Sequence, residues 1–303
     1  MSGARKSARR RTPPPWDRDR IETVILRVLK WLFIVGFVVV TLFPFYYMVL
    51  LSLRSIQELL LAPGRLFPHL AELTATTYKQ VLTPVSAGGQ GFIIFLRNSG
   101  FIAILTVLVS LAFAIPGAYA VSRLQFPGRR GVHFLFLAVY LFPSIMLAIP
   151  LFVLFTRLGL RGNLAGLVLV YISQTVPVAI YMLRNYFQTV PRSLEEAAAA
   201  DGCSRLQILW HVSLPLARPA IIATALYVFM IAWNEYLFAL LFLIENRDHW
   251  TVSLGLAQLS GSIAAPTTTL MAGSVILTVP ILVLFFLTER LLTEGLTAGA
   301  EKG

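Results

Sequence analysis

The sequence predicts an all-α integral membrane protein with six transmembrane helices and a short cytoplasmic helix between the fourth and fifth. Three observations lead to this prediction. The 303 residues are 57% hydrophobic and 13% charged, with a mean hydropathy of +0.77, whereas soluble domains contain about 25% charged residues. The apolar residues form blocks long enough for helices to cross a bilayer core of about 30 Å. The basic residues are unevenly shared between the segments that connect these blocks.

The apolar blocks occupy six windows, each close to the length of about 20 residues that a transmembrane helix needs: 31–53, 99–122, 134–156, 164–183, 220–244 and 270–288. Each window is expected to be helical, because hydrocarbon offers no hydrogen-bond partner to an open backbone. The first window exceeds the apolar core of about 7–15 residues in a secretion signal, and no small-residue cleavage site follows it, so we expect a retained anchor. Kinks are expected at prolines inside the windows, namely Pro44, Pro116, Pro143, Pro150, Pro177 and Pro280.

The basic residues predict the orientation of these spans. If the N-terminus is cytoplasmic, eighteen of the 25 lysines and arginines fall on the cytoplasmic side, as the positive-inside rule requires. Both termini and the segment 188–218 are then cytoplasmic, while 54–97 and 245–268 face outward. Residues 1–21, rich in Arg, Ser and Pro, are expected to be a disordered cytoplasmic tail ahead of a transmembrane domain at 22–303. The tail either contacts anionic lipid headgroups or only sets the topology.

Several function classes find no support in the sequence. The net charge of +11 flanks apolar spans and no nucleic-acid-binding signature accompanies it, so no nucleic-acid partner is predicted. Cys203 is a single cysteine, and the four histidines form no metal-binding pair, so no metal site is predicted. No convergent catalytic set is present, and a phosphate-binding G-x-x-x-x-G-K-[ST] loop is missing. The chain is therefore not expected to be an enzyme.

The segment 191–215 interrupts the apolar pattern between spans four and five. Ser193 is predicted to cap a short helix, with Glu196 three residues on completing a capping box. The alanines at 197–200 favour helix, and Gly202 can adopt the left-handed conformation that ends it. A second short helix is expected at about 204–210. The fifth span then begins after a proline, a residue that is tolerated at a helix start.

The same segment carries a recognisable spacing. Glu196 begins an E-A-A-x-x-x-G pattern that ends at Gly202, and after nine intervening residues the chain reads Val212-Ser213-Leu214-Pro215. This resembles the cytoplasmic docking signature of permease subunits in binding-protein-dependent ABC importers, with Val212 where isoleucine is usual. The resemblance implies a coupling helix that contacts a separate ATPase subunit through Glu196, Ala197, Ala198, Asp201, Gly202, Leu214 and Pro215. Glu196 itself either pairs with a basic residue of the ATPase or serves only as a cap.

A helix lying on the membrane surface is the alternative interpretation of this segment. Ala197–Ala200 would supply little apolar area to the bilayer. The acidic side chains of Glu195, Glu196 and Asp201 would be repelled by anionic lipid. Both properties favour docking to a protein.

Three further segments are similar to the carbohydrate branch of these permeases. Residues 118–129 resemble the first cytoplasmic loop, 233–239 the fifth span, and 295–303 the tail of the maltose-type G subunit. The resemblance extends over 22–303 and implies a type I importer fold in a bacterial or archaeal cytoplasmic membrane. It also implies a second homologous permease subunit, two ATPase subunits and an extracellular or periplasmic solute-binding protein. ATP would be bound by the ATPase, and no cofactor by this chain.

Glu235 is the one Asp, Glu, Lys, Arg or His residue well inside an apolar window. A charge at that depth normally faces protein or water. Trp233, Asn234 and Tyr236 surround it and could contact sugar hydroxyls along a translocation path. A structural link to another helix is the alternative role, and we favour it.

Two other functions remain open at this point. An autonomous secondary transporter usually needs several intramembrane ionisable groups or discontinuous helices, and a single carboxylate is thin support. An ABC permease for a non-sugar cargo such as glycerol phosphate is also possible, although an obvious intramembrane arginine is missing. The sequence does not specify which sugar is carried.

Overall fold

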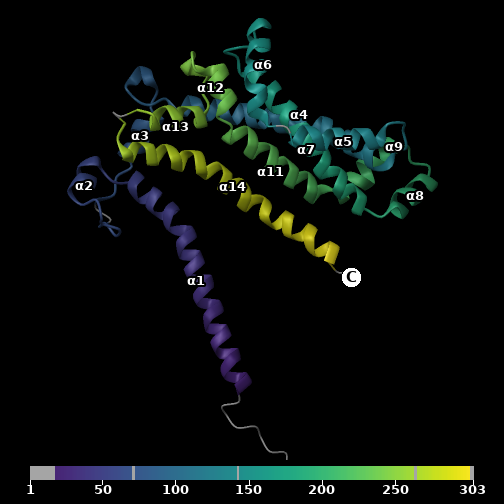
Figure 1. Cartoon of the computed structure of the whole chain (residues 1–303), viewed down its shortest axis with the longest axis horizontal. Helices are drawn as coiled ribbons and strands as arrows, with labels where there is room; N and C mark the ends of the chain where they lie inside the picture. The colour runs from purple at the N-terminus through teal and green to yellow at the C-terminus, as the bar shows by residue number, and fades with distance from the viewer. Residues whose placement is uncertain (1–17, 70–71, 142, 263–264, 301–303) are drawn as a thin grey trace, which may run out of the picture. The chain divides into compact units, whose positions relative to one another are not determined.

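The computed structural model describes residues 18–69, 72–141, 143–262 and 265–300, and every regular element in these ranges is a helix (Figure 1). The predicted all-α class is therefore confirmed. The chain divides into two compact units, residues 1–50 and 51–303. Each unit is described by itself.

The described part of the first unit, residues 18–50, belongs to one long helix, α1 (Arg18–Ser52), with Pro44 inside it. Its apolar stretch, Ile21–Ser52, is long enough to cross a membrane and contains nearly all of the first predicted window. Residues 1–17 of the predicted tail lie outside the described residues. Residues 18–21 belong to α1.

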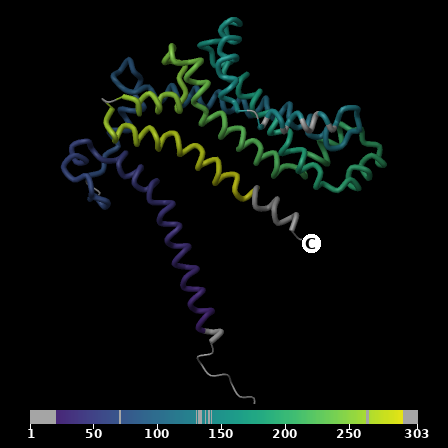
Figure 2. Tube along the Cα trace, viewed as in Figure 1, coloured from purple at the N-terminus to yellow at the C-terminus, as the bar shows by residue number. Residues whose placement is uncertain are grey.

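Four long helices dominate the second unit: α4 (Phe92–Arg123), α7 (Leu164–Thr189), α11 (Arg218–Asn234) and α14 (Thr267–Ala300). α4 packs against α7 and α11, and α11 runs beside α14 (Figure 2). Lipid tails are as apolar as the side chains, so membrane helices associate through close packing of small residues and interhelical hydrogen bonds. The α4–α7 contact has both features, since Ser110 and Thr175 share a buried 2.8 Å hydrogen bond near the fully buried Ala114, Ala118 and Ala179.

Two predicted windows are broken rather than continuous, which corrects the expectation that each is one helix. The third consists of α5 (Arg129–Leu141) and α6 (Ser144–Arg157), with Pro143 as the N-cap of α6. The fifth consists of α11 and α12 (Leu237–Leu243), separated at residues 235–236. Within the described residues, four helices are long and apolar enough to span a membrane. A pair bent by 78°, Arg205–Leu216 with Arg218–Asn234, gives a fifth candidate. The count of six stays a prediction.

The segments predicted to face outward lie together at one end of the second unit. They form α2 (Ile56–Leu61), α3 (Thr76–Leu82), η2 (Val85–Ala87), η4 (Arg247–His249) and α13 (Val252–Ser260). The Asn98 amide at the start of α4 donates hydrogen bonds to the carbonyls of Asp248 (2.7 Å) and Trp250 (3.0 Å). The Gly162 N–H donates to the Phe242 carbonyl at 2.9 Å. These bonds tie the ends of α4 and α12 to the connections that lead into α13 and α7.

The loop that follows α1 is organised around a buried arginine. Arg54 is 1% exposed, and its guanidinium donates to the carbonyls of Glu58 (3.1 Å), Ala62 (3.0 Å) and Arg65 (3.4 Å). A charged donor at the last carbonyls of a helix satisfies them and complements the helix dipole. Arg54 therefore fixes the end of α2 and the turn after it.

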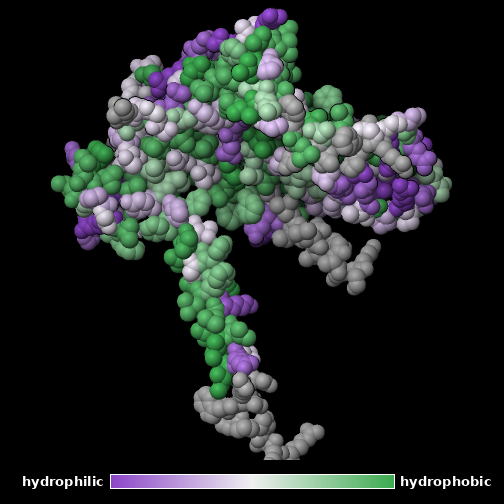
Figure 3. Space-filling model, viewed as in Figure 1, coloured by the Kyte–Doolittle hydropathy of each residue, from purple (hydrophilic) through white to green (hydrophobic). Residues whose placement is uncertain are grey.

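The opposite end of the second unit carries the segment between spans four and five. It forms α8 (Arg192–Ala200), α9 (Arg205–Ile208), the π-helical turn η3 (Leu209–Ser213) and α10 (Leu214–Leu216). Figure 1 shows α8 and α9 far from α3 and α13. In Figure 3 a dense hydrophilic patch covers the α8–α9 end.

Candidate docking corner and intramembrane polar cluster

The helix α8 begins without a side-chain cap. Its N-cap is Pro191, with φ of −60°, and Ser193 lies inside the first turn. The predicted capping box of Ser193 and Glu196 is therefore wrong. Proline supplies a backbone angle that suits a helix start, so α8 begins before Ser193 can act as its cap.

A capping box does occur at the start of the next helix, α9. The Ser204 hydroxyl accepts the Gln207 N–H at 3.4 Å, and the Gln207 side chain accepts the Ser204 N–H at 2.8 Å. α9 is thus fixed by its own first residues.

The turn between α8 and α9 depends on Gly202, which has φ of +88°. The predicted left-handed glycine is therefore present. The Gly202 N–H donates to the Ala199 carbonyl (3.1 Å), and the Cys203 N–H to the Ala198 carbonyl (3.0 Å), as in a Schellman motif. No heavy atom lies within 4 Å of the position of an added Cβ. The turn therefore needs glycine for its backbone angle and not for space. We call α8, this turn and α9 the α8–α9 corner.

Most of the predicted docking residues point away from the bundle. Glu196, Ala197, Asp201 and Gly202 are exposed, and so is Pro215 in the first turn of α10. The remaining two, Ala198 and Leu214, are half-buried, and Leu214 packs against a buried apolar cluster. The exposed face combines carboxylates with small side chains, so another backbone can approach it closely.

The neighbouring carboxylate, Glu195, turns inward and was missed as a site residue. Its Oε1 accepts hydrogen bonds from Arg123 Nε (3.0 Å) and from the Ser213 hydroxyl (2.9 Å). Arg123 also donates through Nη2 to the Val190 carbonyl at 2.8 Å. The side chains of Arg123 and Glu195 are only 7% and 11% exposed. This ion pair joins the ends of α4 and α7 to α8 and η3.

A polar cleft of about 450 Å³ opens beside the ion pair. It lies between the residues that follow α4 and the α8–α9 corner. Gln125 contributes to its lining from the first of these, and Arg192, Glu196 and Arg205 from the second. The corner therefore presents both signs of charge around a hollow.

Inside the membrane region, Glu235 holds the break between α11 and α12. Its Oε2 accepts hydrogen bonds from the Tyr171 hydroxyl (2.6 Å) and the Ala239 N–H (3.2 Å), and its Oε1 accepts the Phe238 N–H (2.8 Å). The carboxylate thus caps the free N–H groups at the start of α12, where negative charge is favourable. The Ser253 hydroxyl of α13 donates to the Glu235 carbonyl at 2.6 Å.

The residues around Glu235 do not form one shared site. Trp233 is 4% exposed, and its indole N–H donates to the Leu277 carbonyl of α14 at 2.9 Å. Asn234 donates to the Met230 carbonyl at 2.9 Å and is exposed. Tyr236 is 39% exposed. Of the four predicted path residues, Asn234 and Tyr236 are open to contact, while Trp233 and Glu235 are engaged within the protein.

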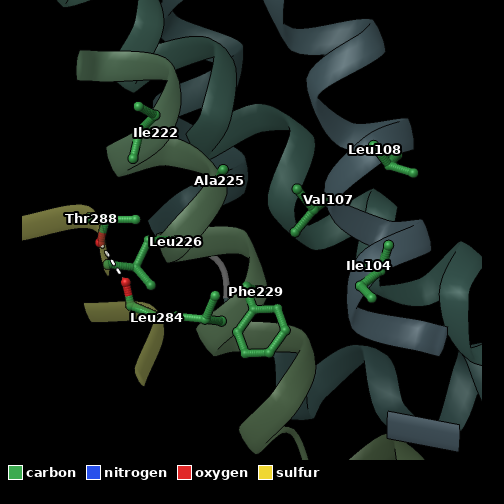
Figure 4. Close-up of a pocket in the computed structure, with 9 residues that line it drawn as sticks. All are labelled: Ile104, Val107, Leu108, Ile222, Ala225, Leu226, Phe229, Leu284 and Thr288. Atoms are coloured by element: carbon green, nitrogen blue, oxygen red, sulfur yellow. Dashed lines mark hydrogen bonds between the residues drawn. The ribbon is translucent and has the colours of Figure 1, made fainter. Parts of the chain in front are cut away.

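An apolar hollow of about 320 Å³ lies between α4, α11 and α14 (Figure 4). Side chains such as Val107, Leu226 and Phe229 line it. Its one hydroxyl, on Thr288, donates to the Leu284 carbonyl at 2.8 Å. This lining suits an acyl chain or an apolar side chain, and it offers little to sugar hydroxyls.

Apolar helices long enough to span a membrane, with an exposed helix–glycine–helix corner between two of them, indicate a polytopic membrane protein. Residues 114–293 match the family described as the binding-protein-dependent transport system inner membrane component. The chain belongs to this family, so it is a permease subunit of an ABC transporter of the inner membrane. Such permeases are not themselves enzymes.

Relatives across nearly the whole chain agree with this family. The chain is 36% identical over 267 residues to the inner membrane ABC transporter permease protein YcjP of Escherichia coli, covering 88% of this chain and 93% of that protein. It is 36% identical over 285 residues to the trehalose/maltose transport system permease protein MalG of Thermococcus litoralis, covering 93% and 99%. A crystal structure of a bacterial ABC transporter involved in alginate import matches with a TM-score of 0.70 and 27% identity, covering 92% and 99%.

Proposed function

We propose that this chain forms half of a translocation pathway for a saccharide and that a separate ATPase subunit docks on the α8–α9 corner. The observation that carries this proposal is the corner itself. Gly202 sets its angle, Glu195 ties it to the bundle, and Glu196 with Ala197 remains exposed. A rigid, outward-facing element of this kind can receive a partner and pass its movement to the transmembrane helices.

The names of the relatives support a carbohydrate cargo. They include permeases for trehalose or maltose, for trehalose, and for arabinooligosaccharides. The solved relative at 27% identity belongs to an importer of the polysaccharide alginate. These cargoes share hydroxyl-rich rings and differ in length, so we infer a mono-, di- or oligosaccharide. A glycerol-phosphate-type cargo has no comparable support.

The assembly that we propose contains a second homologous permease subunit, two ATPase subunits and an extracellular solute-binding protein. The alginate importer, for comparison, was solved with a periplasmic protein carrying an alginate pentasaccharide. This chain lacks a phosphate-binding loop, so ATP is bound and hydrolysed by the partner subunit. ATP binding would move the docked corner and open the translocation pathway outward, and hydrolysis would reset it.

In the proposed topology both termini and the α8–α9 corner are cytoplasmic. The excess of basic residues on that side supports it, as does the grouping of the connecting segments at two opposite ends. Reporter fusions after Arg130 and Gly202 should score as cytoplasmic. Fusions after Gly88 and Asn246 should score as extracytoplasmic. An extracytoplasmic score after Gly202 would contradict both the topology and the docking.

Co-expression with the cognate ATPase tests the function directly. We expect the ATPase to copurify with this chain and uptake to require ATP and the loaded binding protein. A Glu196→Arg variant should weaken copurification, because it reverses an exposed charge on the proposed docking face. Uptake that needs a proton gradient but neither ATP nor the binding protein would instead identify a secondary transporter.

A further inference from the structure

Two adjacent glutamates in the α8–α9 corner have different surroundings and different roles. Successive residues of a helix point about 100° apart, at 3.6 residues per turn, so Glu195 and Glu196 serve different surroundings. Glu196 is exposed, whereas Glu195 is paired with Arg123 and Ser213. We propose that Arg123, Glu195 and Ser213 form a clamp that makes α8 and the end of α4 move as one body during the transport cycle. This inference rests on the proposed function.

The geometry of the clamp favours rigid transmission. Oε1 of Glu195 receives two donors that lie on opposite sides along the chain, 72 residues before it and 18 residues after it. The Arg123 guanidinium reaches a third segment through the Val190 carbonyl at the end of α7. Breaking a buried ion pair leaves an uncompensated charge, which is costly. Independent movement of α8 would break these bonds together.

The clamp is continuous with the packed interior of the bundle. Directly above Arg123 in α4, the Tyr119 ring packs edge-on against Phe187 of α7, with ring centroids 5.9 Å apart. The Tyr186 hydroxyl of α7 donates to the Leu216 carbonyl after the corner at 3.0 Å. Through these contacts a displacement of α8 is transmitted to the packed pair α4 and α7, because no flexible loop separates them from the clamp.

Arg129 provides a matched control. It is the first residue of α5, across the short connection from Arg123. Its guanidinium donates to the carbonyls of Val121 (2.7 Å) and Ser122 (2.9 Å). Both acceptors belong to the last turn of α4. Among the described residues, removing Arg129 disturbs the end of α4 but no hydrogen bond to the α8–α9 corner. Comparing the two arginine variants therefore distinguishes a loss of local stability from a loss of transmission.

The first experiment measures sugar uptake per ATP hydrolysed in the assembled transporter. Arg123→Gln and Glu195→Gln should each lower this ratio by about tenfold, within the range typical of coupling between sites, while the ATPase still copurifies. Arg129→Gln should keep the uptake per ATP within about twofold of the unmodified transporter, a smaller change than the tenfold expected for the clamp variants. The charge-reversed pair Arg123→Glu with Glu195→Arg should recover part of the loss. A normal ratio in both single variants would overturn the clamp.

The second experiment needs no clamp variant, so a folding defect cannot obscure it. Spin labels are placed at the exposed Ser193 and Gln125 in a Cys203→Ser background, because the native Cys203 is exposed and would be labelled. The distance between the labels should be the same without nucleotide and with ATP bound. Gln125 lies two residues after the end of α4, so a distance that changes with ATP would show that α8 and the residues directly after α4 move separately, which would overturn the clamp.

The two proposals fail in different ways. If the unmodified chain does not bind the ATPase at all, the proposed function fails. If it binds the ATPase and the label distance still changes with ATP, the clamp alone fails.

Discussion

Replacement of Gly202 tests whether the α8–α9 corner depends on a backbone angle. In the structure this residue has φ of +88° and nothing within 4 Å of an added Cβ. A larger side chain therefore meets no neighbour, and its whole effect comes from the left-handed conformation. We expect Gly202→Val to weaken ATPase binding more than Glu196→Gln, because it changes the direction of α9 and not one exposed contact.

The magnitude follows from the cost of that conformation. A residue with a Cβ pays about 1–2 kcal/mol in the left-handed region, and a β-branched residue is the least compatible. An energy of this size changes a two-state ratio by a factor of about 5–30. Since apparent affinity scales with the fraction of molecules in the binding-competent state, the ATPase should bind about 5- to 30-fold more weakly. Asparagine visits this region more readily, so Gly202→Asn should retain most of the affinity.

The assay is a titration of purified permease with the ATPase, accompanied by uptake in proteoliposomes. Gly88 is the strain-matched control, since it has φ of +82° and is equally free of neighbours, but it lies in the predicted outward segment. Gly88→Val should leave ATPase affinity unchanged. If Gly202→Val binds like the unmodified chain, or if both valine variants lose affinity equally, the backbone explanation of the corner is wrong.

Three further predictions concern the transmembrane helices and α13, the predicted outward-facing helix that packs against them. Glu235→Gln should retain more uptake than Glu235→Leu, because leucine leaves the donors of Tyr171 and of α12 unpaired at ~1–3 kcal/mol each; equal loss in both, with a need for a proton gradient, would indicate a proton relay. Gly255→Ala should destabilise the subunit by about 1–3 kcal/mol through overpacking, since the new Cβ would lie 2.5 Å from Phe95; unchanged unfolding in a denaturing-detergent titration would contradict this. In the same titration Ser110→Ala should lower the free energy of unfolding by only about 0.6 kcal/mol, the average for an interhelical hydrogen bond in a membrane. A loss as large as that of Gly255→Ala would contradict the expectation that overpacking costs more than this hydrogen bond.

The sequence predicted the spans that are single helices better than those that are broken. The windows at 99–122, 164–183 and 270–288 lie inside α4, α7 and α14, because a long apolar block has few other stable structures in a membrane. The third and fifth windows are equally apolar, so their composition does not reveal that the backbone helix is broken. The available signals were Pro143 and Glu235, a helix terminator and a charge that needed hydrogen-bond donors.

The site shows the same limit at shorter range. Gly202 could be predicted, because a glycine after a run of alanines follows a local rule. The capping box was misplaced, since Ser193 and Ser204 each have a suitable partner three residues on and only the angle at Pro191 distinguishes them. Arg123 and Glu195, which form an ion pair, are 72 residues apart in the sequence, so no local sequence pattern predicts their contact.

The anchoring of the α8–α9 corner has a consequence for inhibitor design. A synthetic peptide of residues 191–215 would contain every bond of the Gly202 turn and the Ser204 capping box. It would lack Arg123, and isolated helices shorter than about 12–15 residues are marginal in water. Such a peptide would spend much of its binding energy on ordering itself. An effective decoy of this surface would need a covalent staple that takes over the role of the missing arginine.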